Sequence, residues 1–501
     1  MRDLRHIIGL ILGPLLALLF LFVVNLQPGN PLVSRAAAVA ILMAVWWITE
    51  AIPIPATALL PVALFPVLGV MSGKATAALY FNNIIFLFIG GFIMALAMQR
   101  WNLHKRIALK IILWIGISPR RIILGFMAAT AFLSMWISNT ATAMMMLPIA
   151  MAIVVKLKDI LDEHAAPKFP VGLLLGIAYA ASIGGTATLI GTPPNLAFIR
   201  IFAISFPNAP DITFAQWIAF GLPFAVILFV IAWLLLVHLY VPRGKAFTAD
   251  RTVFKQEYAG LGPISFEEKT VLILFILLSL LWLFRSPIHI GGLTIPGWSQ
   301  ILPSPKYVDD GTVAIFIAVI LFLIPSKSRP HERLMNWQTA VKLHWGIVIL
   351  FGGGFALAGG FEESGLSAWL GTQLHVFAGL PTILIVVIVC AMLTFLTELT
   401  SNTATTQMVL PILASLAVAI GVNPLLLMVP ATLSASCAFM LPVATPPNAI
   451  VFGSGEIRIQ DMVRTGIYLN LIGVVIVTAV MYLLGTHIFG IDMSTMPAWA
   501  Q

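Results

Sequence analysis

Charged residues are scarce in this chain of 501 residues: Asp, Glu, Lys and Arg together make up 9% of it, whereas hydrophobic residues make up 60%. Soluble globular proteins carry roughly 25% charged residues, so the composition excludes a large soluble domain and predicts a polytopic membrane protein. The formal net charge of +8 comes from basic residues clustered in short connections. That clustering is typical of membrane topology and argues against nucleic-acid binding.

Motifs of several enzyme and pump classes are also missing. The chain has two cysteines, Cys390 and Cys437, both in apolar segments, so we expect neither a disulfide nor a cysteine metal site. Gly-Lys occurs at 73–74 and 244–245, but Ala follows each time, so neither completes a P-loop. His-Glu at 331–332 lacks the second His of a zinc protease. We therefore expect no ATP-driven pump and no enzyme.

One polar motif occurs twice in this apolar background. Ser138–Thr142 and Ser401–Thr405 both read Ser-Asn-Thr-Ala-Thr, lie 263 residues apart and are followed at equal spacing by Leu-Pro-Ile. A second motif, Thr-Pro-Pro-Asn, recurs at Thr192–Asn195 and Thr445–Asn448, 253 residues apart. Because the landmarks keep their order, the sequence predicts an internal duplication with its special chemistry at matching points of two halves.

The residue types in these motifs suit the binding of small ions. Pro-Pro cannot continue a helix, so each Thr-Pro-Pro-Asn marks a break inside a membrane segment. A broken helix exposes N–H groups that suit an anion and C=O groups that suit a hard cation. Ser, Asn and Thr add side-chain oxygens. A single copy of these motifs could simply reflect small residues that let helices pack closely and prolines that kink them. Matched breaks in two halves of the chain instead indicate a transporter site.

The apolar runs predict an all-α protein with about 11 transmembrane helices plus two re-entrant hairpins. The hairpins are expected where a motif divides an apolar run into arms of about 15 residues, short of the roughly 20 needed to cross. The predicted parts are a first span at 1–34, a first repeat at 35–242 with a hairpin at 122–155 and a broken helix at 171–201, a cytoplasmic connection at 243–270, and a second repeat at 271–501 with a hairpin at 383–419 and a broken helix at 425–452. Basic connections place the N-terminus in the cytoplasm, and a tail without Lys or Arg places the C-terminus outside. An odd number of spans in the first unit plus its link would invert the second repeat.

Two carboxylates stand out in apolar sequence. Glu50 precedes a proline-rich stretch, and we expect it to hold the exposed N–H groups of a helix break. Glu398 adjoins the second Ser-Asn-Thr motif, where it would repel an anion. We therefore expect Glu398 to face away from the ligand and to bind backbone or hydroxyl groups; its first-half counterpart is Met135.

The doubled motifs, together with Trp46–Glu50 and Trp101–Arg106, resemble the divalent anion/sodium symporter family over essentially the whole chain. That family includes INDY-type Na⁺/dicarboxylate transporters and Na⁺/sulfate transporters. The resemblance implies a homodimer in the plasma (inner) membrane, in which each protomer has a scaffold domain and a transport domain that moves as an elevator. It also implies Na⁺ as the co-transported ion and no organic cofactor.

The resemblance carries site residues onto this chain. The first Na⁺ clamp would comprise Ser134, Ser138, Asn139 and the backbone at Gly191; the second would comprise Thr397, Ser401, Asn402 and the backbone at Ala444. The substrate would be bound between the hairpin tips by Asn139, Thr140, Thr192, Pro193, Asn402, Thr403, Thr445 and Pro446.

The predicted function is secondary active transport that couples inward Na⁺ flow to uptake of C4-dicarboxylates such as succinate, malate and fumarate. No Lys or Arg lies beside the motifs, so the charge of the anion must be balanced by Na⁺ and by helix N-termini, which couples the two ligands. A Na⁺-independent dicarboxylate exchanger and a Na⁺/sulfate or Na⁺/citrate symporter remain alternatives. A channel is a further alternative, but matched breaks around a central site favour a carrier.

Overall fold

The computed structural model describes residues 2–160, 168–241, 251–290, 293–493 and 495–500. Within these ranges, seven helices are long and apolar enough to cross a membrane: Leu4–Phe22, Pro31–Thr49, Gly73–Arg100, Phe214–Tyr240, Trp345–Ser364, Asn402–Ala419 and Ile459–Ile488. Shorter apolar helices lie at Ile54–Val67, Asn139–Val155, Phe169–Gly185, Asp310–Leu323 and Leu425–Ala435. The prediction of a helical, polytopic membrane protein is confirmed, while the number of spans stays a prediction.

The helices of the first half follow the expected hairpin and break. They are α1 (Arg2–Phe22), α2 (Pro31–Thr49), α3 (Ile54–Thr57), α4 (Leu60–Val67), α5 (Gly73–Tyr80), α6 (Asn83–Arg100), α7 (Leu103–Ile115), α8 (Pro119–Ser134), α9 (Asn139–Ile160), α10 (Phe169–Gly185), α11 (Pro193–Ser205) and α12 (Phe214–Tyr240). The first Ser-Asn-Thr motif separates α8 from α9, and Thr-Pro-Pro-Asn starts α11.

The second half repeats this order after the connection. Its elements are α13 (Arg251–Gly260), α14 (Phe266–Leu283), β1 (Ile288–Ile290), β2 (Leu293–Ile295), α15 (Asp310–Leu323), α16 (Trp337–Ala340), α17 (Trp345–Ser364), α18 (Leu366–Leu374), α19 (Thr382–Leu396), α20 (Asn402–Ala419), α21 (Leu425–Ala435), α22 (Pro446–Phe452), α23 (Ile459–Val480) and α24 (Thr486–Ile488). The second motif separates α19 from α20, and α22 follows the second break.

Three expected features need correction. The boundary at residue 34 falls inside α2, which begins at Pro31 after the Asn30 cap. The connection ends earlier than residue 270, because Ser265 and Glu268 form a capping box that starts α14 at Phe266. The chain is also not purely helical. β1 and β2 form an antiparallel ribbon in which Ile288 pairs with Ile295, because Ile and Thr favour extended backbone.

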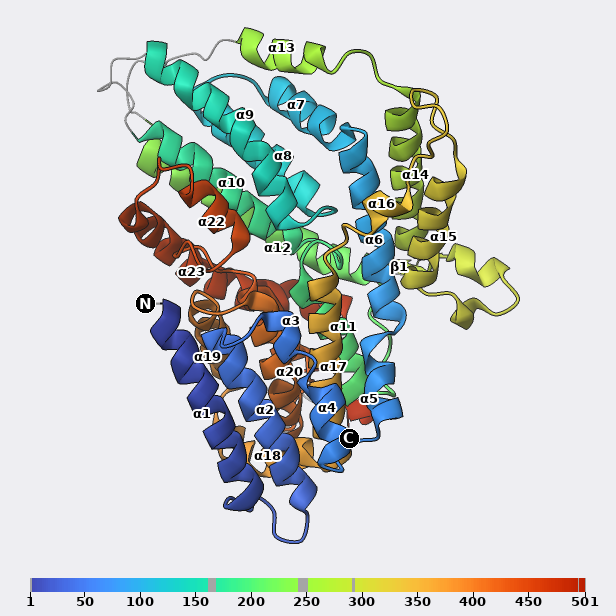
Figure 1. Ribbon diagram of the computed structural model, residues 1–501, viewed down its shortest axis with the longest axis vertical. Coiled ribbons are helices and arrows are strands. Elements are labelled where there is room, and N and C mark those ends of the chain that lie inside the picture. Colours follow the sequence, from blue (N-terminus) through green and yellow to red (C-terminus); the bar gives the residue numbers. More distant parts are fainter. Residues whose placement is uncertain (1, 161–167, 242–250, 291–292, 494, 501) are drawn as a thin grey trace.

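The two broken helices occupy the centre of the protein. Every residue of α10 and of α21 is buried. α8, α9 and α12 pack around α10, whereas α1, α2 and α18 lie in the lower part of Figure 1 and α6, α14 and α15 group at its right. The outer face is apolar in turn: Leu234 is 52% exposed and Val475 67%, as expected for side chains that face lipid.

Candidate functional site

The tip of the first hairpin is shaped by its own motif. Ser134 ends α8, and the Ser138 hydroxyl accepts the Ala141 N–H at 3.3 Å where α9 begins. Ser401 caps α20 in the same way, by accepting the Ala404 N–H at 3.4 Å. Both serines of the repeated motif thus start the second arm of their hairpins, because a side-chain oxygen satisfies an N–H that has no partner in the first turn.

Oxygen atoms from the first hairpin and the first break converge on one point. The Ser134 hydroxyl donates to the Ala181 carbonyl of α10 at 2.7 Å. One terminal atom of the Asn139 amide lies 2.5 Å from the Ser134 Oγ, 3.1 Å from the Ala181 oxygen and 3.2 Å from the Gly191 oxygen. With nitrogen at that position the amide donates to these acceptors. With oxygen there, four oxygens face one another, which is the environment of a hard cation.

Two glycines are required for this close approach. A Cβ at Gly191 would lie 2.4 Å from the Gly185 oxygen, and a Cβ at Gly185 would lie 2.6 Å from the Asn139 Oδ1. Both distances are far below van der Waals contact, so a side chain at either position would push the break away from Asn139. The small size of these two glycines therefore lets the backbone at Gly191 lie beside the first hairpin tip.

Other polar groups fix the shape of the first break. The Thr188 hydroxyl donates to the Met135 carbonyl at 2.5 Å and accepts the Gly191 N–H at 3.1 Å, so it ties the break to the hairpin. The fully buried Asn195 amide donates to the Thr188 carbonyl at 2.7 Å. These bonds satisfy backbone groups that the interrupted helix leaves without partners, which lets irregular backbone exist at membrane depth.

Glu398 fixes the second break, as expected from its position. Its carboxylate, 3% exposed, accepts the N–H groups of Phe439 at 2.7 Å, Met440 at 2.9 Å and Leu441 at 2.9 Å. It also accepts the Asn470 amide of α23 at 2.7 Å. The prediction that Glu398 holds backbone groups is confirmed. Four donors on one carboxylate also explain how a charge is accommodated in so apolar a place.

The residues of the second clamp are less closely joined than those of the first. The Thr397 hydroxyl donates to the Thr394 carbonyl at 3.1 Å, within its own helix. Asn402 Oδ1 is buried and has no hydrogen-bond partner among the described residues. No hydrogen bond among the described residues joins these side chains to the buried backbone of Ala444. Asn402 therefore offers an acceptor that lacks a donor, and a cation would satisfy it.

The predicted substrate residues stand at helix starts. Thr192 and Thr445 are the N-caps of α11 and α22, and Pro193 and Pro446 are the first residues of these helices. Thr140 and Thr403 lie in the first turns of α9 and α20. Pro193-Pro194 and Pro446-Pro447 carry no N–H group, so these helix starts favour an anion through the helix dipole and the threonine hydroxyls rather than through unpaired N–H groups.

The two halves meet at their breaks. α22 packs on α9 and α10, and α11 packs on α20, so each half-helix lies against the other half of the chain. The ring of Tyr179 on α10 contacts the ring of Phe439 edge-on, with centroids 5.2 Å apart. The structure thus brings the two hairpin and break pairs into one buried region, which is the arrangement that a ligand held between them requires.

One expectation fails. Glu50 follows α2 in a left-handed conformation, with φ of 52°, and is exposed. Its carboxylate has no partner within the described ranges, so it does not hold a helix break. The proline-rich stretch after it starts α3 at once, and Pro at the first positions of a helix has no N–H that needs a carboxylate.

Sequence reasoning missed several residues that shape the site. Ala181 contributes only a backbone oxygen, which no sequence pattern marks. Asn195 and Asn448 close the repeated Thr-Pro-Pro-Asn motif, and that repetition could have assigned them. Asn448 donates to the carbonyls of Ala438 at 3.2 Å and Leu441 at 3.0 Å, which matches the role of Asn195 in the first half.

Two solved structures share the fold. The YdaH transporter of Alcanivorax borkumensis superposes with a TM-score of 0.56 at 13% identity, over 97% of this chain and 99% of that one. MtrF of Neisseria gonorrhoeae, described as representing a class of antimetabolite efflux pumps, gives a TM-score of 0.55 at 14% identity, over 84% of this chain and 85% of that one. At such low identity the likeness concerns the fold alone.

Sequence comparison identifies much nearer relatives. Proteins named sodium-dependent dicarboxylate transporter SdcS, from Staphylococcus saprophyticus and from Staphylococcus aureus strain MRSA252, are each 46% identical to this chain. The matches cover 98% of this chain and 94% and 93% of the two relatives. The family model described as sodium:sulfate symporter transmembrane region matches residues 10–491. Because that match spans nearly the whole sequence, this chain belongs to the sodium:sulfate symporter family.

Proposed function

We propose that this protein is a symporter that couples inward Na⁺ flow to uptake of C4-dicarboxylates such as succinate, malate and fumarate. The observation that carries the proposal is the convergence of the Ser134 hydroxyl, the Asn139 amide and the Ala181 and Gly191 carbonyls at the first break. When the Asn139 oxygen, rather than its nitrogen, faces this point, the set consists of uncharged oxygens, which suits Na⁺. The name of the relatives at 46% identity supports Na⁺ as the driving ion and a dicarboxylate as the cargo.

In this mechanism the first clamp consists of Ser134, Ser138, Asn139 and the backbone at Gly191, and the second of Thr397, Ser401, Asn402 and the backbone at Ala444. Na⁺ binding lowers the electrostatic cost of placing a dianion between the two tips, since neither motif contains a basic residue. The anion is oriented by Asn139 and Asn402, by the threonines at positions 140, 192, 403 and 445, and by helix starts at Pro193 and Pro446.

Transport would then proceed by movement of a transport domain that contains both hairpins and both broken helices. Full burial of α10 and α21, and the packing of each half-helix on the opposite half, support a single body around the site. The proposal includes 11 spans, two inverted repeats, a cytoplasmic N-terminus, an external C-terminus and a homodimer. Basic connections and the odd number of spans support the orientation.

Uptake of radiolabelled succinate into proteoliposomes tests the function. We expect saturable uptake with an inward Na⁺ gradient and none when choline replaces Na⁺. Uptake in choline that requires internal dicarboxylate would identify an exchanger instead. If succinate is not taken up but sulfate or citrate is, in the presence of Na⁺, the substrate assignment is wrong and the Na⁺ coupling stands.

Single substitutions test the two clamps. Asn139→Ala removes the amide that reaches Gly191, and Asn402→Ala removes a buried acceptor without a partner. We expect each to abolish uptake while the protein keeps its elution volume in size-exclusion chromatography. Asn25→Ala makes the same chemical change at an exposed position and should transport normally. Normal uptake by either clamp variant would refute the site.

A further inference from the structure

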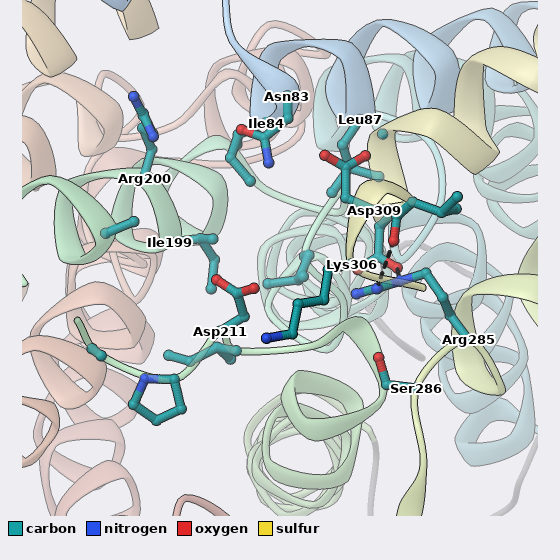
Figure 2. A pocket seen from close by; sticks show the side chains of 18 of the residues that line it. Asn83, Ile84, Leu87, Ile199, Arg200, Asp211, Arg285, Ser286, Lys306 and Asp309 are labelled. Atoms are coloured by element: carbon teal, nitrogen blue, oxygen red, sulfur yellow. Dashed lines mark hydrogen bonds and ion pairs between the residues drawn. The ribbon is translucent and has the colours of Figure 1, made fainter. Parts of the chain in front are cut away.

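A second polar cavity lies apart from the hairpin tips. It has a volume of about 850 Å³ and is enclosed by the start of α6, by α11 and the segment after it, and by the connections that precede α15. Figure 2 shows Asn83, Arg200, Asp211, Arg285 and Lys306 around it. Leu189, from the first break itself, also lines this cavity. The cavity is therefore bordered by the charged connections on one side and by one residue of the first break on another.

Most of the charges around the cavity already have partners or face water. Arg285 forms an ion pair with Asp310 and also donates to the Val308 carbonyl. Asp309 caps α15 by accepting the Thr312 N–H at 2.7 Å. Lys306 and Asp211 are exposed, so solvent screens them.

Arg200 differs from these groups. It projects from α11, is partly buried, and makes no hydrogen bond or ion pair with any described residue. Its Nε is among the buried atoms without a partner. A guanidinium always carries its charge and has five donors; here the buried Nε lacks a partner, and the terminal nitrogens, which are not among the buried atoms, are open to a ligand in the cavity. A carboxylate is the ligand whose two oxygens match its geometry.

Position connects Arg200 with the proposed substrate path. It lies seven residues after Pro193, which is two turns along the same helix and roughly 10 Å from the break. Seven residues also return a side chain to nearly the same face. The position that corresponds to it in the second half, 253 residues later, is Gly453. At this pair of matching positions, the first half therefore has a positive charge and the second half has none.

We propose that Arg200 forms a second carboxylate-binding site in this cavity, where the dicarboxylate binds before it reaches the hairpin tips. This inference rests on the proposed function. A cation in a partly dehydrated cavity raises the local concentration of a dianion and speeds its encounter with the deeper site. Arg200 would thus determine apparent substrate affinity, while Na⁺ binding depends on the clamps.

Kinetics in proteoliposomes give the first test. Arg200→Gln should raise the KM for succinate about tenfold or more, as expected for the loss of one charge-assisted contact. Vmax and the Na⁺ concentration for half-maximal uptake should stay within about twofold, because a contact made before the transport step affects binding alone. Lys306→Gln removes the same charge at an exposed point of the same cavity and should change KM less than about twofold. Arg200→Lys keeps the charge but loses the two-point geometry, so it should recover only part of the affinity.

A second test does not depend on transport. Ala203 lines the cavity one turn from Arg200, and the native thiols of Cys390 and Cys437 are buried. Ala203→Cys should react with a membrane-impermeant methanethiosulfonate reagent, and choline succinate should slow that reaction. The protection should vanish when Arg200→Gln is added to the same protein.

The outcomes separate the two proposals. Succinate protection that requires Arg200 supports the cavity site, even if wild-type protein shows no Na⁺-driven uptake and the proposed function fails. Equal protection with and without Arg200→Gln, absence of protection, or equal protection by choline chloride at the same ionic strength would overturn the cavity site. So would an unchanged KM in Arg200→Gln in an otherwise active transporter.

Discussion

Replacing Glu398 by Gln is the sharpest test of how the second break is held. The carboxylate accepts four hydrogen bonds: Oε1 from the N–H groups of Phe439 and Met440 and from the Asn470 amide, and Oε2 from the Leu441 N–H. Gln has the same size but only one oxygen. When that oxygen replaces Oε1, the new NH₂ group faces the Leu441 N–H, so one donor meets another donor.

The magnitude follows from these contacts. One buried N–H without an acceptor costs about 1–3 kcal/mol. The three remaining bonds lose their charge assistance, which is worth roughly 1 kcal/mol each. Burying a charge costs several kcal/mol of desolvation free energy, and the neutral Gln avoids part of that cost, which offsets part of the loss. The net loss of folding free energy is then about 2–3 kcal/mol, and we expect the melting temperature of this 501-residue chain to fall by about 2–3 °C.

Thermal unfolding of purified protein in detergent, followed by intrinsic fluorescence, measures this effect. Glu50→Gln is the matched control, because Glu50 is exposed and has no partner in the described part of the chain; it should leave the melting temperature within about 1 °C. Equal melting temperatures for Glu398→Gln and wild type would refute the role given to the carboxylate. If Glu398→Gln and Glu50→Gln lower the melting temperature equally, the effect comes from the change in net charge and not from the hydrogen bonds of Glu398.

Two further substitutions test the packing. Gly184→Ala places a Cβ 2.3 Å from a backbone oxygen of α8, so we expect a reduced yield of monodisperse protein by size-exclusion chromatography. Gly260→Ala is the control, because its Cβ meets nothing within 4 Å, and it should elute as wild type. Arg106→Gln removes the guanidinium that pairs with Glu268, whose side chain is 6% exposed and then keeps only the Ser265 N–H, and should destabilise by about 3 kcal/mol, seen as a lower melting temperature. Lys105→Gln breaks a solvent-exposed pair and should cost at most about 1 kcal/mol.

Sequence alone could predict the helix interruptions with good accuracy. The second broken helix was expected at 425–452, and α21 and α22 occupy these limits. The second hairpin was expected at 383–419, and α19 and α20 occupy 382–396 and 402–419. The reason is physical: Pro-Pro cannot lie inside a helix, and Ser before Asn-Thr caps the helix that follows. Such local rules need no knowledge of neighbouring segments.

What sequence could not predict depends on contacts between distant segments. The Ala181 carbonyl reaches the first cluster only because α10 packs against α8, with Gly184 at the point of closest approach. Arg200 is an isolated basic residue in the sequence, and only the cavity explains why its lack of a partner matters. The role of Glu50 could not be predicted because, in the sequence alone, an intramembrane carboxylate and a carboxylate at the end of a helix have the same apolar surroundings.

In both halves the hairpin tip is hydrogen-bonded to its own helix break, but the side chain that makes the bond donates in one half and accepts in the other. In the first half, the Thr188 hydroxyl of the break donates to the hairpin backbone at Met135. In the second half, the carboxylate of Glu398, which is the counterpart of Met135, accepts from the backbone of the break. In each case the hairpin tip is bonded to its own break, and the half-helices then pack across to the other half. These bonds tie each hairpin tip to its own break, which supports the proposal that both hairpins and both broken helices move as one transport domain.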